Sequence, residues 1–95
     1  MPRRYAAKVD TNQQPIVRDL RNIFGPDVVL DLSAVGRGCP DIMVGVRGRN
    51  LLMEIKTDKG KLTADQVYFH REWGGQVHIV RTLDDALNVI ERETT

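Results

Sequence analysis

Cysteine and aromatic residues are scarce in this chain of 95 residues, which contains one Cys, one Trp, two Tyr and two Phe. A disulfide needs two cysteines, so Cys39 cannot form one within the chain, and this fits a reducing compartment. No base is placed to make Cys39 a nucleophile, and we interpret it as a small side chain in a tight loop. His78 has no Cys or His at metal-ligand spacing, which argues against a zinc site.

Long apolar runs are also missing. No stretch approaches the apolar length of a membrane-spanning helix, and residues 1–5 lack the apolar core of a signal peptide. These absences predict an intracellular, cytoplasmic protein. The length predicts a single domain, and the 41% of hydrophobic residues are enough for one modest core, which a partner subunit would help to stabilise.

A strong overall charge is absent, because the net charge is only +1. The charge is unevenly divided, however. Residues 1–61 contain 11 Lys and Arg against 7 Asp and Glu, whereas residues 62–95 contain 3 against 6. We expect a phosphate backbone to be attracted to the first part. For any single one of these basic residues, the simpler interpretation is an ordinary solvated surface charge.

Two short apolar runs, residues 42–46 and 51–55, are separated by Arg-Gly-Arg-Asn and predict a β-hairpin. We predict a loop of four residues, 47–50, which places Val46 opposite Leu51 and Asp41 opposite Lys56. Because side chains alternate between the faces of a strand, Asp41, Glu54 and Lys56 then share one face. The apolar side chains of both runs take the other face.

In this register Asp41 and Glu54 are diagonal neighbours, about 7–8 Å apart at the backbone. Two carboxylates beside a lysine suit Mg²⁺ or Mn²⁺, which take few protein carboxylates and retain waters and phosphate oxygens. The pattern therefore indicates a metal-assisted phosphodiester hydrolase. The competing interpretation is a solvated strand face, because an acid followed by Glu-x-Lys is common by chance.

A longer ordered pattern surrounds these residues. Residues 36–41 read Gly-Arg-Gly-Cys-Pro-Asp, residues 54–56 read Glu-Ile-Lys, and residues 61–63 read Lys-Leu-Thr, with Gln66 shortly after them. This string resembles the VRR-NUC branch of the PD-(D/E)XK nuclease superfamily, in the compact stand-alone form often encoded by phages. The resemblance covers about residues 8–91.

The resemblance implies a restriction-endonuclease-like core and an endonuclease that requires Mg²⁺. Asp41, Glu54 and the carbonyl of Ile55 would bind one or two metal ions, and Lys56 would orient the attacking water or stabilise the transition state. The implied substrate is structured DNA, such as a four-way (Holliday) junction or a flap. The implied assembly is a homodimer, because each site cuts one strand.

The family usually carries a metal-facing carboxylate on its first helix, and the aligned position here is Pro15. Gln13 or Gln14 would bind the water shell of the metal instead, or both are surface or capping residues. The departure at Pro15 favours an alternative, a catalytically weak or inactive nuclease-fold subunit that binds DNA. A small interaction protein that uses the fold only to dimerise is a further alternative.

Basic residues in two glycine-containing segments are candidate phosphate contacts. Arg37 lies between Gly36 and Gly38, which allow a close backbone approach to phosphate. Lys59 and Lys61 lie in the polar connector after Lys56, where a solvated turn is the simpler explanation. These three residues are our predicted nucleic-acid contacts.

The remaining patterns complete an α/β fold with a mixed sheet. We predict a first helix capped within residues 10–12 and ended by Gly25-Pro26, and a first strand over residues 28–35, in which Asp31 lies at an exposed edge or near the metal. A second helix opens with the capping box Thr63-x-x-Gln66, so Gln66 is a cap, an active-site residue, or both. A strand over residues 77–80 runs parallel to the third strand. A last helix follows Thr82, and residues 91–95 are predicted to fray.

Overall fold

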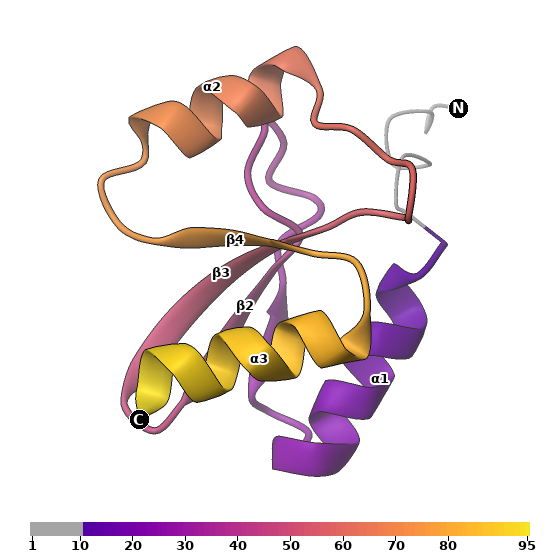
Figure 1. Cartoon of the computed structure of the whole chain (residues 1–95), viewed down its shortest axis with the longest axis vertical. Helices are drawn as coiled ribbons and strands as arrows, with labels where there is room; N and C mark the ends of the chain where they lie inside the picture. The colour runs from indigo at the N-terminus through magenta and orange to yellow at the C-terminus, as the bar shows by residue number, and fades with distance from the viewer. Residues whose placement is uncertain (1–10) are drawn as a thin grey trace.

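The computed structural model describes residues 11–95, which form three helices and one four-stranded mixed sheet and confirm the predicted α/β fold. The elements follow in the predicted order (Figure 1). They are α1 (Gln13–Phe24), β1 (Val29–Asp31), β2 (Ile42–Val46), β3 (Arg49–Ile55), α2 (Ala64–Glu72), β4 (Val77–Val80) and α3 (Leu83–Thr94). The predicted cap at Asp10 and the basic residues before it lie outside the described residues. None of the described helices is long and apolar enough to cross a membrane.

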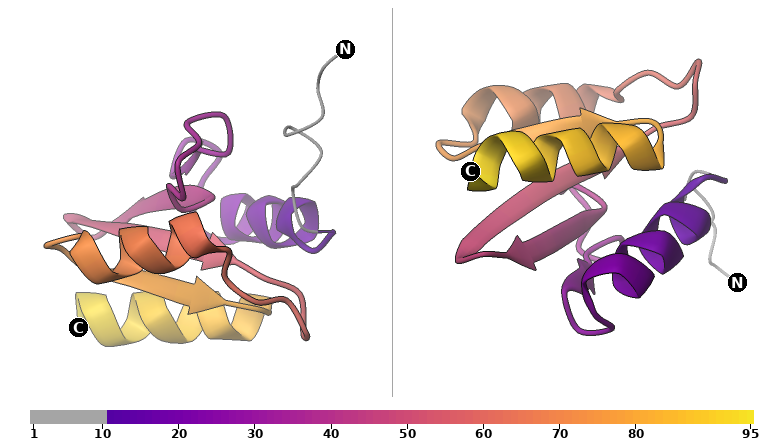
Figure 2. Two further views of the ribbon diagram at one scale, coloured as in Figure 1. Left: turned by 90° about the horizontal axis from the view of Figure 1, so that it is seen from above. Right: turned by 60° about the horizontal axis from the view of Figure 1, so that its bottom comes forward.

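The sheet has the strand order β1-β2-β3-β4. The first three strands form an antiparallel meander, and β4 pairs in parallel with β3 after the crossover through α2. Helices α1 and α3 cover one face of the sheet and α2 lies on the other face (Figures 1 and 2). This arrangement separates the apolar core from the face that carries the candidate site.

The core lies between the sheet and the pair α1 and α3. Every second residue of β2 and β3 points into the core, because side chains alternate between the faces of a strand. Each helix also presents an apolar stripe to the core, because residues about 3.6 positions apart lie on the same side of a helix. The buried members of the core include Ile42, Val44, Leu51, Met53, Ile55, Ile16, Val17, Leu20, Ala86, Val89 and Ile90. Helices α1 and α3, the first and last described elements, thereby pack on the central hairpin of β2 and β3.

The loop of the hairpin is shorter than the predicted four residues. Val46 pairs with Arg49, so only Arg47 and Gly48 form the turn, and both have positive φ values of 55° and 79°. Two central residues in the left-handed region are typical of the type I′ turn that matches the twist of a hairpin. The register is therefore shifted by two residues from the predicted one. A shift of two leaves every side chain on its predicted face, but it changes which residues lie opposite each other.

The first strand is also shorter than predicted, covering only Val29–Asp31 instead of residues 28–35. The carboxylate of Asp31 accepts hydrogen bonds from the backbone N–H and the hydroxyl of Ser33, at 2.9 and 2.5 Å. This local turn ends the strand, because the side chain offers the backbone an alternative to the sheet ladder. Asp31 is exposed, and the hydrogen bonds to Ser33 lower the pKa of its carboxyl. Of the two predicted alternatives, the exposed edge is the one observed.

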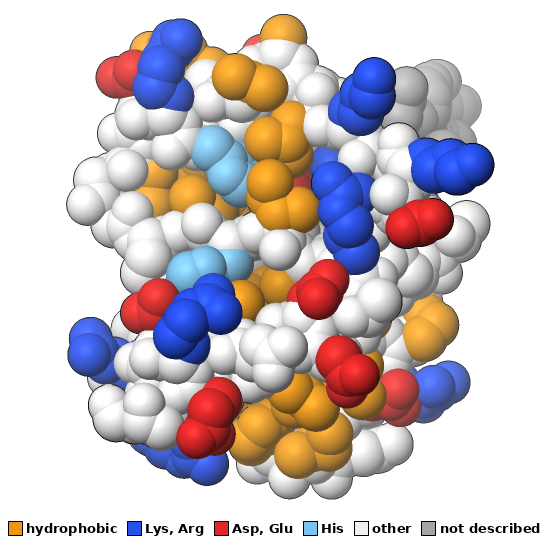
Figure 3. Space-filling view, in the orientation of Figure 1, with side chains coloured by type: hydrophobic (Ala, Val, Ile, Leu, Met, Phe, Trp, Pro, Cys, Tyr) orange, Lys and Arg blue, Asp and Glu red, His pale blue; other side chains and the backbone are white. Residues whose placement is uncertain are grey.

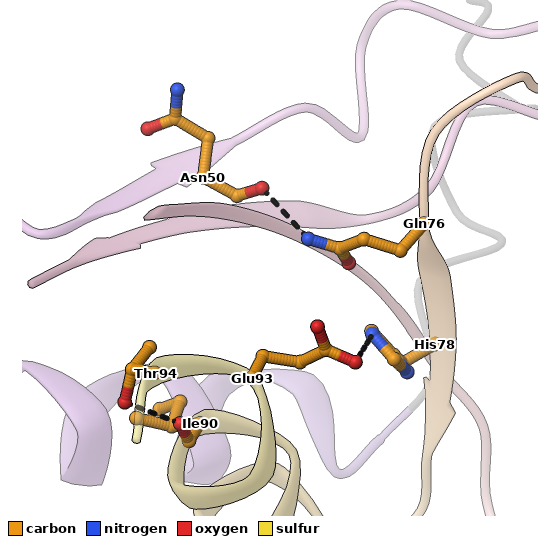
Figure 4. Close-up of polar contacts among 6 residues, drawn as sticks. All are labelled: Asn50, Gln76, His78, Ile90, Glu93 and Thr94. Atoms are coloured by element: carbon orange, nitrogen blue, oxygen red, sulfur yellow. Dashed lines mark hydrogen bonds and ion pairs between the residues drawn. The ribbon is translucent and has the colours of Figure 1, made fainter. Parts of the chain in front are cut away.

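The last helix extends further than predicted. We expected residues 91–95 to fray, but α3 continues to Thr94. The Thr94 hydroxyl donates to the carbonyl of Ile90, and Arg47 Nη1 in the hairpin turn donates to Thr94 Oγ1 at 2.9 Å. The contact with Arg47 holds the end of α3 against the hairpin, and Figure 4 shows the bond between Thr94 and Ile90. The sequence prediction failed because the stabilising partner, Arg47, is 47 residues away.

A histidine of β4 lies close to a glutamate in the last turn of α3, next to Thr94. His78 Nε2 lies 3.5 Å from Glu93 Oε2 (Figure 4). Burial lowers the pKa of His78, and Arg92 lowers it further, whereas Glu93 acts in the opposite direction. The ring is therefore neutral near pH 7.

This neutral histidine predicts that the protein loses stability in mild acid. A base with a lowered pKa binds fewer protons in the folded state than in the unfolded state, where the pKa is about 6.5. The free energy of unfolding should therefore be constant above that pH and decrease as the pH falls below it. Urea unfolding at pH 7.5 and 5.5 measures this change. The decrease should be smaller in His78→Gln, and equal decreases in both proteins would contradict a contribution from His78.

Candidate active site

Asp41 directly precedes β2, and Glu54 lies on the neighbouring strand β3. Ile42 pairs with Met53, so the next residues outward in the antiparallel register are Asp41 and Glu54. Side chains at directly opposite positions have Cβ atoms about 4.5–5.5 Å apart. The predicted diagonal arrangement, with Asp41 opposite Lys56, is therefore wrong. The two-residue turn gives a register in which these two residues are closer at the backbone than the sequence analysis expected.

Asp41 stands at the entrance to β2, directly after the buried residue Pro40. The backbone N–H of Ile55 donates to Asp41 Oδ2 at 2.7 Å. This contact ties the carboxylate to the end of β3. Its position is therefore set by two strands rather than by its own loop.

Glu54 is almost completely buried, with 1% of its surface exposed. Gln66 Nε2 donates to Glu54 Oε2 at 3.0 Å, while Gln66 Oε1 accepts from the backbone N–H of Thr63 at 2.9 Å. The capping box of α2 is complete, because the Thr63 hydroxyl accepts from the Gln66 N–H. Gln66 thus forms the predicted cap and also contacts Glu54. Its cap interaction orients the amide that binds the buried carboxylate.

Lys56 follows Glu54 on the same face of the sheet and is 8% exposed. Its backbone N–H donates to the Val80 carbonyl at 3.0 Å. Its carbonyl accepts from Asn12 Nδ2 at 2.8 Å, and the same amide nitrogen donates to the Arg81 carbonyl at 2.9 Å. Asn12 was predicted within the cap of α1, but its side chain makes no cap hydrogen bond. It joins the ends of β3 and β4 instead.

We expect Asn12→Ala to destabilise the protein by about 1–3 kcal/mol, because two partly buried carbonyls lose their donor. The midpoint of urea unfolding measures the loss. Asn88→Ala on the exposed side of α3 is the matched control and should change stability by less than about 0.5 kcal/mol. Equal midpoints for both variants would show that Asn12 does not hold the strand ends together.

A second long-range contact fixes the connector that carries two of the predicted phosphate contacts. Arg81 Nη1 donates to the carbonyls of Thr57 and Gly60, at 2.5 and 2.9 Å. Lys59 and Lys61 are exposed on this connector. Sequence analysis missed the role of Arg81, since the residue follows β4 and its partners lie more than 20 residues earlier.

The loop that holds Arg37 packs against the start of α2. Gly36, Arg37 and Gly38 have φ values of 81°, 58° and 78°, which are unusual for a residue with a side chain such as Arg37. A Cβ on Gly38 would lie 2.2 Å from the backbone oxygen of Asp65, so only glycine fits there. Arg37 is exposed on this loop, as are Lys59 and Lys61 on theirs.

The pKa values of Cys39 and His70 are shifted by burial and by the charges of the candidate site. Burial, followed by the nearby charges of Glu54 and Asp41, raises the pKa of the Cys39 thiol. The thiol therefore stays protonated, which agrees with its interpretation as a small side chain in a tight loop. Burial and then the charge of Lys56 lower the pKa of His70, whose Nε2 is buried without a hydrogen-bond partner among the described residues.

Helix α2 covers this face only partly. None of its residues is buried, and Trp73, which we interpret as a packing residue, is 46% exposed although it stacks on Phe69 at 5.1 Å between ring centroids. Figure 3 shows both histidine rings at the surface, one of them among apolar side chains next to α2.

The donor set limits the metals that the site would hold. Among residues 11–95 no group of three or more His, Cys, Asp and Glu is arranged to bind an ion. The oxygen ligands that the sequence analysis predicts are those of Asp41, Glu54 and the Ile55 carbonyl, a set that would suit a Mg²⁺ ion that keeps most of its waters. Pro15 and Gln14 are exposed on α1, whereas Gln13 is 2% exposed and its Oε1 has no hydrogen-bond partner among the described residues. Gln13 is therefore the amide of α1 that faces the interior.

Comparison of the chain with protein-family models, with curated proteins and with solved structures found no match. The resemblance to VRR-NUC nucleases therefore stays a prediction from the motifs in the sequence.

Proposed function

We propose that this protein is a metal-dependent endodeoxyribonuclease with a restriction-endonuclease-like core. The observation that carries the proposal is the register of β2 and β3, which pairs Ile42 with Met53 and so brings Asp41 next to Glu54, with Lys56 next on the same face. Two carboxylates and a lysine are the groups that metal-assisted phosphodiester hydrolysis requires. The basic excess of residues 1–61, which contain all three, supports an anionic substrate.

Each residue of the site has a distinct role in this proposal. A Mg²⁺ or Mn²⁺ ion held by Asp41, Glu54 and the Ile55 carbonyl would supply an activated water and neutralise charge on the phosphate. The Lys56 ammonium donates hydrogen bonds to the attacking water or to a phosphate oxygen, where negative charge grows during the reaction. Gln66 keeps Glu54 in place through its hydrogen bond. Arg37, Lys59 and Lys61 bind flanking phosphates from exposed positions.

The proposed substrate is branched DNA, such as a four-way junction or a flap, and the proposed assembly is a homodimer. One site per chain cuts one strand, so paired cuts require two chains. Both statements come from the resemblance to phage-encoded stand-alone VRR-NUC nucleases.

The test is cleavage of an end-labelled four-way junction and of its matched linear duplex. Each substrate is incubated with Mg²⁺, with Mn²⁺ and with a chelator, and the unchanged protein is compared with Asp41→Ala and Lys56→Ala. Metal-dependent cutting of the junction that both variants lose would support the proposal. Failure of the unchanged protein to cut any of the substrates with either metal would refute the nuclease activity.

The alternative is a nuclease-fold subunit that binds DNA with little or no catalysis. It is favoured by Pro15, which is exposed at the position where the resemblance places a carboxylate on α1. This alternative predicts DNA binding that decreases with salt and survives Asp41→Ala, without metal-dependent cutting. The same substrates in a binding assay separate the two functions.

A further inference from the structure

The sheet face that carries the carboxylates continues toward the hairpin turn. In register, the row beside Glu54 contains Leu30, Met43 and Leu52, and the row after it contains Gly45 and Asn50. Leu30 is 58% exposed, which shows that this part of the face over β1 and β2 is uncovered by the described residues. An apolar surface thus begins directly beside the candidate active site.

This surface is hollowed. A depression of about 280 Å³ is lined by Asp27, Val28, Leu30, Met43, Gly45 and Asn50. Its walls are mainly apolar, with one carboxylate and one amide at the rim. It belongs to the same face as Glu54, but it is separate from the carboxylates and from the residues that hold them.

Gly45 creates the depth of the hollow. Its backbone does not require glycine, because its φ is not in the left-handed region. A Cβ there would meet only the Asn50 Oδ1, at an ordinary contact distance of 3.7 Å. Glycine weakens a strand, so its presence in β2 is typical of a place where another group approaches closely.

Asn50 presents its side chain at the rim. Its backbone carbonyl accepts from Gln76 Nε2 at 3.1 Å, and its amide group points away from this contact (Figure 4). An amide both donates and accepts hydrogen bonds, and the Asp27 carboxylate accepts them. These groups can recognise the polar edge of a nucleobase, and the aliphatic side chains of Val28, Leu30 and Met43 offer apolar contact to its flat face.

The distance to the carboxylates fits a nucleic-acid strand. Asn50 and Glu54 are four residues apart on one strand, about 13 Å at 3.3 Å per residue, and Leu52 is about 7 Å from Glu54. Stacked nucleotides are spaced by about 3.4 Å along a strand. A base in the hollow would therefore lie about two to four nucleotides from a phosphate bound at Asp41 and Glu54.

We propose that this hollow binds an unpaired nucleobase of the strand whose phosphate lies at Asp41 and Glu54. The inference rests on the proposed function and adds a requirement for unpaired bases near the cut. A base within a duplex has its flat faces covered by stacking, so it cannot enter the hollow unless it is unpaired. Branched and single-stranded DNA offer such bases, whereas a continuous duplex does not.

The test measures DNA binding rather than cleavage, so its result does not depend on nuclease activity. A fluorescent single-stranded oligonucleotide is compared by anisotropy with the same oligonucleotide in which the central nucleotides are abasic, in separate buffers containing Ca²⁺ or chelator. The unchanged protein should bind the complete oligonucleotide about 10-fold more tightly. Gly45→Val fills the hollow and should remove this preference while leaving the affinity for the abasic strand unchanged.

Controls separate the hollow from general effects of glycine substitution. Gly74→Ala, where a Cβ would meet nothing within 4 Å, should keep the full preference. Leu30→Ala changes an exposed wall residue without filling the hollow and should reduce the preference, which keeps the test valid if Gly45→Val fails to fold. Circular dichroism and urea unfolding establish that each variant is folded.

Several outcomes would overturn the inference. Equal affinity of the unchanged protein for the complete and abasic strands, or an intact preference in folded Gly45→Val, excludes a base site. If light scattering shows that Gly45→Val changes the oligomeric mass while the preference for the complete strand is kept, the hollow is an interface with a second copy of the chain and not a base site. Base-dependent binding without cleavage would refute the proposed nuclease activity alone, and cleavage without base dependence would refute this inference alone.

Discussion

We expect Glu54→Gln to cut DNA more than about 100-fold more slowly than the unchanged protein, which is the largest effect on activity. The substitution keeps the shape of the side chain and removes the negative charge. Because Glu54 is 1% exposed and lies opposite Asp41, no other described acid on this strand face can replace it. Single-turnover cleavage with saturating Mg²⁺, repeated with Mn²⁺, measures the loss.

The control for this prediction is Glu72→Gln, which makes the same change at an exposed position of α2. Glu72 forms a surface ion pair with its neighbour Arg71, and such pairs contribute little. The control should retain the full cleavage rate. Glu54→Gln should unfold at a similar urea concentration to the unchanged protein, and a full cleavage rate in this variant would remove Glu54 from the mechanism.

The largest effect on stability is expected for Gly38→Ala, a loss of about 2–5 kcal/mol. The left-handed backbone costs a non-glycine residue about 1–2 kcal/mol, and overpacking against the Asp65 backbone adds about 1–3 kcal/mol. The backbone of Asp65 cannot move away without displacing the first turn of α2. Since Gln66 follows directly, we also expect slower cleavage from the displaced contact with Glu54.

Gly36→Ala provides a matched comparison within the same loop. Gly36 has a similar φ of 81°, but a Cβ there would meet nothing within 4 Å. This variant should lose only the backbone contribution, about 1–2 kcal/mol. Urea unfolding of the two variants separates backbone strain from the contact with α2, and equal losses would show that the loop does not pack on α2 as described.

The hairpin illustrates how far sequence reasoning reaches. The strands were predicted from their apolar runs, and the shared face of Asp41, Glu54 and Lys56 followed from alternation, which a register error of two residues does not disturb. The register itself was wrong, because the turn places Arg47 in a left-handed conformation that few non-glycine residues adopt. The prediction assigned all four polar residues 47–50 to the loop, whereas Arg49 and Asn50 belong to β3.

Contacts between distant residues were missed for a different reason. Asn12 reaches the carbonyls of Lys56 and Arg81, which are 44 and 69 residues away. Its position at the start of a helix predicts a cap hydrogen bond that the side chain does not make, and no local pattern indicates the contacts that it makes instead. The cap formed by Gln66 was predicted correctly, and its contact with Glu54 is compatible with the cap because the two involve different atoms of the same amide.

The sequence by itself determined the order of the elements, the apolar core and the face on which Asp41, Glu54 and Lys56 lie, because these depend on local periodicity along the chain. The tertiary structure alone decided that Asp41 lies opposite Glu54, that Gln66 and Asn12 hold the two sides of the site, and that a hollow forms over Gly45. Each of these depends on the packing of segments that are far apart in the chain. Periodicity places a side chain on a face, but only the assembled sheet determines what it meets there.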